Sequence, residues 1–318
     1  MSRYFLGVDT GATKSHALII DENGRSLGFG VDGPGNWEVV GWDGLRRVLD
    51  GIITQATDEA GIGRTQIAGA GFGLAGYDWP EDRKPHMDII HEIGITCPLQ
   101  LVNDAFIGLP AGTDKGWGVV ISAGTSCNCY GRHPDGKIGR VTGGAGYFGE
   151  YAGAGELVWK AVEAVAAAWT QRGAPTRLTD TFLTVTGAPD VTSLLAGLMR
   201  GRYTLGAERA PLIFEVANSG DEVALELVRW AGRELGALAN SVIRQLDIAD
   251  LAMDVVLSGS FFKGSPLMQQ MVADTIHAIA PHAQLIRLRT DPVIGAALLG
   301  REAADKSAAT VAKSAFAD

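Results

Sequence analysis

The sequence predicts a two-domain α/β protein in which one βββαβα unit occurs twice. Its 318 residues exceed the length that one compact core usually accommodates. A run of strand, glycine-and-threonine turn and strand begins at Tyr4 and returns about 110 residues later, at Trp117. Each copy ends in a segment of the form Asp-x-x-Ile-Gly, at Asp104–Gly108 and at Asp291–Gly295. Because these matches keep the same order, we infer a duplication of one unit.

The first copy begins with the apolar strand Tyr4–Val8, followed by the turn DTGATKS at Asp9–Ser15. The runs HALIID and RSLGFGV flank an Asn-Gly turn, which predicts a hairpin of two further strands. The run QIAGAGFGLAG predicts a fourth strand that ends in glycines, and PLQLVND predicts a fifth after a helical stretch. We expect this first domain to span residues 1–114.

The second copy repeats this order with WGVVIS, the loop AGTSC, a short strand at Asn128–Gly131 and the run KIGRV. The runs MDVVLSGSFF and AQLIRLRTD match the fourth and fifth strands. Between the two parts lies an insertion, about residues 150–248, with apolar residues at helical spacing. We expect a larger second domain over residues 115–291, a last helix over about 292–304 that packs on the first domain, and a polar tail at 305–318.

The composition excludes several classes of protein. A net charge of −9 and a pI near 5.2 argue against a nucleic-acid or membrane partner. No apolar run approaches the roughly 20 residues of a membrane span, and no basic-then-apolar leader opens the chain. The three cysteines cannot form a disulfide framework, and Cys127 and Cys129 fit a buried strand better than a metal site. We therefore expect a cytoplasmic protein.

The turn at Asp9–Ser15 combines residue types that bind phosphate. Glycine and threonine in such a turn can direct backbone N–H groups and hydroxyls at phosphate oxygens, and Asp9 can hold a hydrated Mg²⁺ beside them. A plain β-turn is the alternative, but the second loop favours a pair of loops that clamp one triphosphate. The candidate phosphate-binding residues are Asp9, Thr10, Gly11, Thr13 and Lys14 in the first loop, and Gly124, Thr125 and Ser126 in the second.

Asn103 and Asp104 follow an apolar strand, and open α/β sheets place ligands at the carboxyl ends of strands. Asp104 can accept the proton of an attacking hydroxyl there. The alternative is an N-cap for a helix that begins near Ala105. The equivalent Asp291 precedes Pro292, a favoured first helical residue, and is predicted to be an N-cap.

Three further segments have residues suited to a sugar or a nucleoside. Asn36 and Trp37 lie in a Pro/Gly loop and can bond and stack on a sugar, unless Trp37 fills the core instead. The glycine-dense loop Gly143–Gly155, which contains Glu150, can bind a polyol or form a flexible connection. The Gly259-Ser260 pair can let an adenosine approach the backbone, or it is an ordinary turn between strand and helix.

The stretches GVDTGATKSHALIID, LVNDA, ISAGTSCNCYG and DPVIGAALLG resemble the actin/hexokinase/Hsp70 ATPase superfamily. Over about residues 3–302 the chain is similar to the BadF/BadG/BcrA/BcrD ATPase family, especially its N-acetylglucosamine kinase branch. The resemblance implies a homodimeric sugar kinase that uses ATP and Mg²⁺, with Asp104 as general base and Asp9 near the metal. It implies an acceptor site at Asn36, Trp37, Asn103, Asp104, Gly144 and Glu150, and an adenosine site at Gly220, Asp221, Gly259 and Ser260.

The chain departs from the family's pattern in its loops. The family's Gly-Thr-Gly-Ser reads Gly-Thr-Ser-Cys at Gly124–Cys127, and Ala75 stands where the kinases often have serine. Ala145 replaces a tryptophan, and Gly149–Ala152 reads Gly-Glu-Tyr-Ala instead of Gly-Asp-Glu-Gly. These changes leave the identity of the sugar open. The alternatives are an ATPase that activates an iron–sulfur enzyme, and a non-catalytic sugar-sensing regulator.

Overall fold

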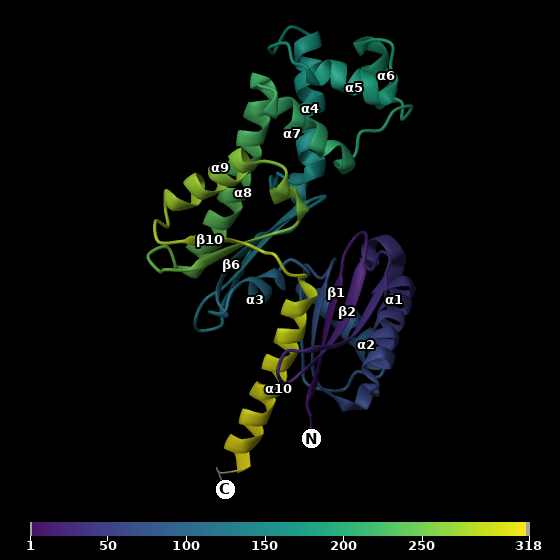
Figure 1. The fold of residues 1–318 in the computed structure, drawn as a ribbon, viewed down its shortest axis with the longest axis vertical. Helices are drawn as coiled ribbons and strands as arrows, with labels where there is room; N and C mark the ends of the chain where they lie inside the picture. Colours follow the sequence, from purple (N-terminus) through teal and green to yellow (C-terminus); the bar gives the residue numbers. More distant parts are fainter. Residues whose placement is uncertain (1, 316–318) are drawn as a thin grey trace. The chain divides into compact units, whose positions relative to one another are not determined.

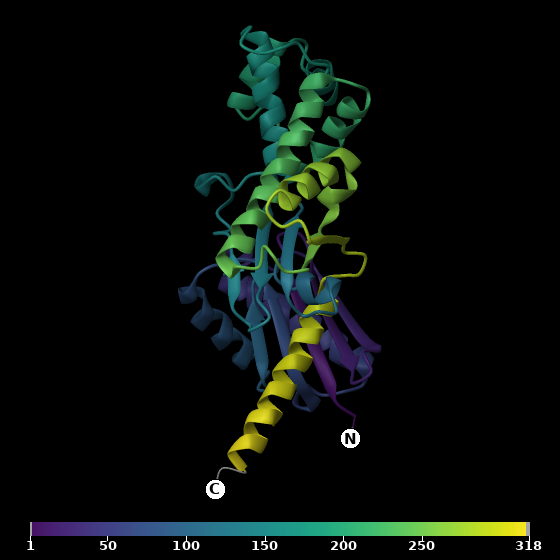
Figure 2. The same cartoon turned by 90° about the vertical axis from the view of Figure 1, so that its left-hand side faces the viewer.

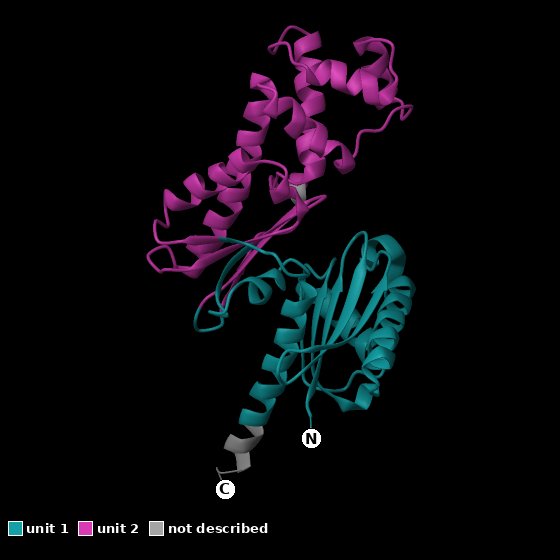
Figure 3. Ribbon diagram, in the orientation of Figure 1, with its two compact units in different colours: residues 1–120, 134–136, 286–318 teal, residues 121–133, 137–285 magenta. Residues whose placement is uncertain are grey.

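The computed structural model describes residues 2–315, apart from the side chains of Ala145 and of residues 310–315. It divides into two compact units (Figure 3): residues 1–120, 134–136 and 286–318 form unit 1, and residues 121–133 and 137–285 form unit 2. The strand orders are β3-β2-β1-β4-β5 in one sheet and β10-β9-β6-β7-β8 in the other. When β6 to β10 are matched to β1 to β5 in chain order, the second order is the first one read from the opposite edge. This confirms the predicted α/β fold with a duplicated unit.

The sheet of unit 1 brings the ends of three strands to one edge. Strand β1 is antiparallel to β2 and parallel to β4, which is parallel to β5. In this register Asp9 lies opposite Gly73, and Gly73 lies opposite Val102. The residues that follow β1, β4 and β5 therefore meet at the same edge. The strands are β1 Tyr4–Thr10, β2 Ser15–Asp21, β3 Ser26–Asp32, β4 Ile67–Leu74 and β5 Leu99–Val102.

Helices cover both faces of this sheet (Figures 1 and 2). Alternate residues of β1 face opposite sides, so that Leu6 and Val8 pack with α1 and α2, while Phe5 packs with Val293 and Ala297 of α10. Gly71 allows a close approach on the α10 side, because a Cβ there would collide with the carbonyl of Ala296. The helical segments are α1 Trp37–Ala60, η1 Arg64–Gln66, η2 Pro80–Asp82, α2 Arg83–Glu92, α3 Gly108–Gly112 and α10 Val293–Ala315.

The last helix differs in extent from the sequence-based expectation. Helix α10 runs from Val293 to Ala315 within unit 1, through most of the segment expected to be a polar tail. Residues 316–318 of that tail lie outside the described residues. The backbone carbonyl of Asp291 accepts from Ile294 N at 3.1 Å and so begins the helical pattern.

The second sheet carries the helical insertion. Helix α8 has the predicted apolar face: Val228, Leu235, Leu238 and Val242 are buried, and Leu225 is partly buried. The strands are β6 Gly118–Ala123, β7 Cys127–Arg132, β8 Ile138–Arg140, β9 Asp254–Ser258 and β10 Gln284–Arg287. The helical segments are η3 Ala145–Phe148, α4 Ala154–Trp169, α5 Leu178–Thr186, α6 Val191–Met199, η4 Ala207–Arg209, α7 Ala210–Asn218, α8 Glu222–Leu246, η5 Ser260–Lys263 and α9 Pro266–His277.

Across the described residues, no single helix has both the length and the apolar character of a membrane span. The pair α5 and α6 meets these criteria only when the two helices, bent by 64°, are counted together.

Candidate nucleotide and acceptor sites

The first loop, Gly11–Lys14, is a closed turn at the tip of the β1–β2 hairpin. Gly11 N donates to Lys14 O at 2.9 Å, and Gly35 N donates to Gly11 O at 3.0 Å. The side chains of Thr13 and Lys14 are exposed. The loop is thus fixed through its backbone, while a hydroxyl and an ammonium group remain on its surface for an anionic ligand.

Asp9 lies at the carboxyl end of β1, just before this loop. Burial, and then the negative charge of Asp104, raise the pKa of Asp9 to about 7, while Lys14 opposes the rise. The hydroxyl of Thr10 is buried and has no hydrogen-bond partner among the described residues. The negative charges of Asp9 and Asp104 fit a hydrated divalent cation. The described residues contain no group of three or more His, Cys, Asp or Glu side chains able to hold a metal, so such a cation would take further ligands from phosphate and water.

Asp104 lies in a turn after β5 rather than at a helix start. Burial, and then the charge of Asp78, raise the pKa of Asp104 to about 7. Its Oδ1 accepts from Ala105 N at 2.9 Å, as does Oδ1 of Asn103. These bonds draw the chain into a turn, so the helix expected near Ala105 begins only at Gly108. Asp104 is therefore a half-buried carboxylate and not the N-cap of that helix.

Asn103 is used within the same turn. Its amide Nδ2 donates to Asp78 Oδ1 at 3.0 Å, and the side chain is buried. With the acceptor side bonded to Ala105 as well, Asn103 shapes the turn that presents Asp104. Sequence reasoning missed Asp78. The sequence feature that could have indicated Asp78 is its position just after β4, whose end lies beside the end of β5 and so beside Asp104.

Asn36 and Trp37 were predicted to lie in a loop. In the structure they lie at the start of helix α1. Asn36 is the N-cap of α1, and its Oδ1 accepts from Glu38 N at 2.9 Å. The Trp37 ring stacks on Trp42 with centroids 4.2 Å apart, and its Nε1 donates to Gly76 O at 2.6 Å. Both polar and apolar surfaces of Trp37 are thus engaged within unit 1, which favours the core-filling interpretation. Asn36 remains beside Gly76 at the sheet edge.

The second loop, Gly124–Ser126, rests on the first turn of α4. Gly124 N donates to Ser126 O, and the carbonyls of Gly124 and Thr125 accept from Ala154 N and Gly155 N, each at 2.9 Å. The side chains of Thr125 and Ser126 are exposed. Like the first loop, this loop is fixed by its backbone and leaves its hydroxyls accessible.

A cavity of about 610 Å³ lies in unit 2 beside the second loop, a volume typical of small-molecule sites. Gly259 permits β9 to end close to β6: its φ is +104°, and a Cβ there would collide with the Ala123 carbonyl. Phe214 and Phe261 give the cavity an apolar wall, with ring centroids 5.5 Å apart. These rings and Lys263 were not foreseen from the sequence, because they come from segments far apart in the chain. Gly124, Thr125 and Ser260, all predicted site residues, also line the cavity.

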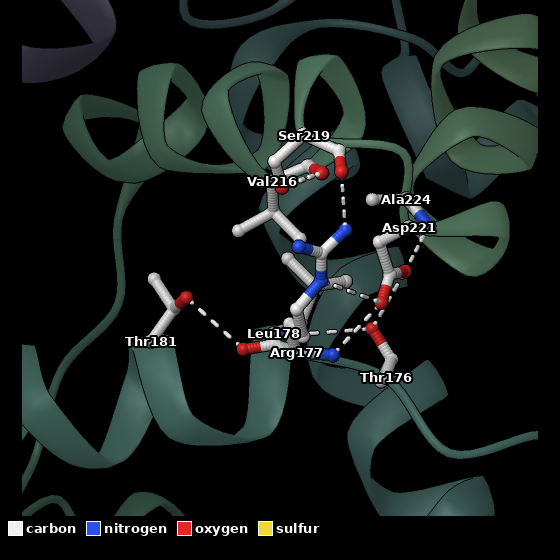
Figure 4. Close-up of polar contacts among 8 residues, drawn as sticks. All are labelled: Thr176, Arg177, Leu178, Thr181, Val216, Ser219, Asp221 and Ala224. Atoms are coloured by element: carbon white, nitrogen blue, oxygen red, sulfur yellow. Dashed lines mark hydrogen bonds and ion pairs between the residues drawn. The ribbon is translucent and has the colours of Figure 1, made fainter.

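Gly220 and Asp221 are not among the described residues that line this cavity. Figure 4 shows that the Asp221 carboxylate instead accepts from Thr176 Oγ1 at 2.9 Å, Arg177 N at 2.8 Å and Ala224 N at 2.9 Å. Burial alone would raise the pKa of Asp221, but these bonds and the Arg177 guanidinium lower it. Asp221 thus caps α8 and fixes the segment before α5, a structural role that an aspartate before a helix could have suggested.

The loop that contains Glu150 is held by that side chain. The two carboxylate oxygens of Glu150 accept from Thr142 N at 2.6 Å and Gly143 N at 2.8 Å, and the residue is buried. Gly144 lies against the Phe148 ring. Glu150 therefore closes the base of its own loop, which was not foreseen when it was predicted to hold a sugar. The side chain of Ala145, where the family has tryptophan, lies outside what the structure describes.

Two sheets with the same strand order, each with a glycine- and threonine-containing loop after its first strand, are typical of the actin-like class of ATPases. Residues 6–300 match the BadF/BadG/BcrA/BcrD ATPase family, and the chain belongs to that family.

Curated relatives match along nearly the full length of the chain. An N-acetyl-D-glucosamine kinase from Dictyostelium discoideum is 28% identical, covering 93% of this chain and 97% of its own. An N-acetylmuramic acid/N-acetylglucosamine kinase from Clostridium acetobutylicum is 24% identical, covering 95% and 100%. Among solved structures, a ROK family glucokinase from Streptomyces griseus, crystallised with glucose and AMPPNP, has a TM-score of 0.61 at 20% identity and covers 94% of this chain and 99% of its own. This last likeness supports the fold.

Proposed function

We propose that this chain is an ATP-dependent kinase of N-acetylglucosamine or a related amino sugar or hexose. The observation that carries the proposal is the half-buried Asp104, in a chain whose curated relatives are named as kinases of N-acetylated sugars. A carboxyl group with a pKa of about 7 is well matched to proton transfer at neutral pH.

In the proposed reaction, an acceptor hydroxyl attacks the γ-phosphorus of ATP while the bond to the bridging oxygen of ADP breaks. Asp104 accepts the proton that the hydroxyl loses. Asn103 and Asp78 hold the turn on which Asp104 lies. The cavity beside Gly124 and Thr125 would take the nucleoside, with its apolar wall against the base.

Asp9 would hold Mg²⁺ through water, because the negative charges of Asp9 and Asp104 at this end of the sheet call for a counter-charge. When bound, this ion neutralises charge on the phosphates. The raised pKa of Asp9, to which burial and then the charge of Asp104 contribute, is the feature that supports a cation there. The first loop contributes exposed donors at Thr13 and Lys14.

The iron–sulfur activator is the weaker alternative. Such a protein needs accessible thiolates as cluster ligands. Cys127 and Cys129 are buried, and burial raises the pKa of both thiols far above the usual range, so neither is suited to this role.

A coupled assay of ADP release with a panel of amino sugars and hexoses tests the proposal. We expect N-acetylglucosamine or a close relative to raise ADP release well above the rate without sugar. Asp104→Asn should lower the sugar-dependent rate by about 10²–10⁴ while nucleotide binding persists. Near-normal turnover of this variant would refute the role of Asp104. The homodimer and the cytoplasmic location remain predictions, and light scattering tests the first.

A further inference from the structure

Two loops of unit 2 with different proposed ligands are joined to each other. We call Gly124–Cys127 the phosphate loop and Gly143–Gly153 the acceptor loop. The residues that follow the acceptor loop donate to the carbonyls of Gly124 and Thr125, each at 2.9 Å. At its last residue, Gly153, a Cβ would collide with the backbone of Ser126. The end of the acceptor loop therefore rests directly on the phosphate loop.

Cys127 adds a side-chain link between the two loops. Its Sγ lies 3.1 Å from the carbonyl oxygen of Tyr151 and 3.8 Å from that of Glu150. Burial, with Glu156 and Glu150 adding, raises the pKa of this thiol far above its usual range. The group is thus an S–H donor at neutral pH, and it donates into the acceptor loop.

The link continues from Tyr151 into the rest of the acceptor loop. The preceding Glu150 accepts from Thr142 N and Gly143 N at 2.6 and 2.8 Å, which closes the base of the loop. The centroid of the Tyr151 ring lies 6.2 Å from that of the Trp230 ring and 5.9 Å from Lys160 Nζ. A movement of the Tyr151 carbonyl would therefore shift the neighbouring Glu150 and the backbone of Thr142 and Gly143 that it holds.

The residue after Tyr151 is strained. Ala152 has a φ of +93°, a region that residues with a side chain rarely adopt, and it is fully buried. Such a conformation persists only where surrounding contacts hold it. Here those contacts are the Cys127 thiol on one side and the Gly153 packing on the other.

We propose that Cys127 is a positioning residue that couples occupancy of the phosphate loop to the order of the acceptor loop through the Tyr151 carbonyl. Phosphoryl transfer requires the reacting atoms to lie about 3–3.5 Å apart and in line. A fixed spacing between the loops would serve this requirement. The inference rests on the proposed function only in naming a sugar as the acceptor. The contact between Cys127 and the Tyr151 carbonyl can be tested with nucleotide alone.

Hydrogen exchange of the full chain, with and without AMPPNP and Mg²⁺, tests the link. In the wild type we expect nucleotide to slow exchange in peptides that cover residues 142–153. Cys127→Ala should reduce this protection about fivefold, the effect of one lost hydrogen bond on an opening equilibrium. Cys127→Ser should restore it, because a hydroxyl can donate to the same carbonyl. Cys97→Ala, which removes a thiol from unit 1, is the matched control and should behave like the wild type.

Ala152→Gly gives a second test that leaves the thiol in place. It relieves the strain and should also weaken the nucleotide-dependent protection, so the proposal stays testable even where Cys127→Ala folds poorly. Full protection in both variants would overturn the proposal. In the sugar assay, Cys127→Ala should release more ADP per phosphosugar formed than Cys127→Ser. If nucleotide slows hydrogen exchange in residues 142–153 of the wild type but no sugar is phosphorylated, the proposed function is contradicted and the coupling between the two loops is still supported.

Discussion

Replacing the proposed general base should make the protein more stable at alkaline pH. The pKa of Asp104 is about 7 in the folded chain and 3.8 for an ordinary aspartate. Because the folded state holds this proton more tightly, the wild type loses stability as pH rises from about 4 to 7. At 1.36 kcal/mol for each pH unit the loss is about 4 kcal/mol in all, and about 2–3 kcal/mol of it falls between pH 5 and 8.

Asp104→Asn removes this loss. The asparagine Oδ1 can still accept from Ala105 N, so the turn should be retained. The quantity to compare is the free energy of unfolding of the variant minus that of the wild type. We expect this difference to be about 2–3 kcal/mol larger at pH 8 than at pH 5. Urea unfolding at both pH values measures this, with tryptophan fluorescence as the signal and EDTA present to exclude cations.

Asp58→Asn is the matched control, because Asp58 lies exposed on α1 in the same unit. It should differ little from the wild type at either pH. The reasoning about burial at Asp104 is refuted if Asp104→Asn gains no stability relative to the wild type between pH 5 and 8.

Three further predictions follow from the contacts of single side chains. Sugar-dependent kcat/KM should fall as pH drops below about 7, because Asp104 must be ionised to accept a proton, and a profile flat down to pH 5 would contradict this. Asp221→Ala should lower stability by about 1–3 kcal/mol in thermal melts with little change in KM for ATP, whereas Asp190→Ala, which removes the exposed N-cap of α6, should cost less. Glu150→Gln should raise KM for the acceptor about tenfold, because the new amide nitrogen is a donor and leaves either Thr142 N or Gly143 N without an acceptor; an unchanged KM would mean that the loop does not shape the acceptor site.

The strands and their loops could be predicted from the sequence, since apolar runs that end in glycine have a strong local signal. The roles of polar residues were harder to predict. Asn36 was assigned to a sugar and also caps α1, because the residue types that cap helices are those that bind ligands. Asp221 shows the same ambiguity, resolved here by the hydrogen bonds of its carboxylate.

Contacts between distant segments have no local pattern. The wall formed by Phe214 and Phe261 joins α7 to η5, and the link from Cys127 to Tyr151 joins β7 to a loop that follows β8. Asp78 was missed for a similar reason, since its pairing with Asn103 depends on the register of β4 and β5. Tertiary packing determines these contacts.

The central claim is that Asp104 activates a sugar hydroxyl for phosphoryl transfer from ATP. The most direct test is the amount of phosphosugar formed for each ADP released, measured by mass spectrometry with N-acetylglucosamine as acceptor. The account predicts one phosphosugar for each ADP in the wild type and almost none with Asp104→Asn, although the variant still binds nucleotide. ADP release without phosphosugar in the wild type, or undiminished phosphosugar in the variant, would contradict it.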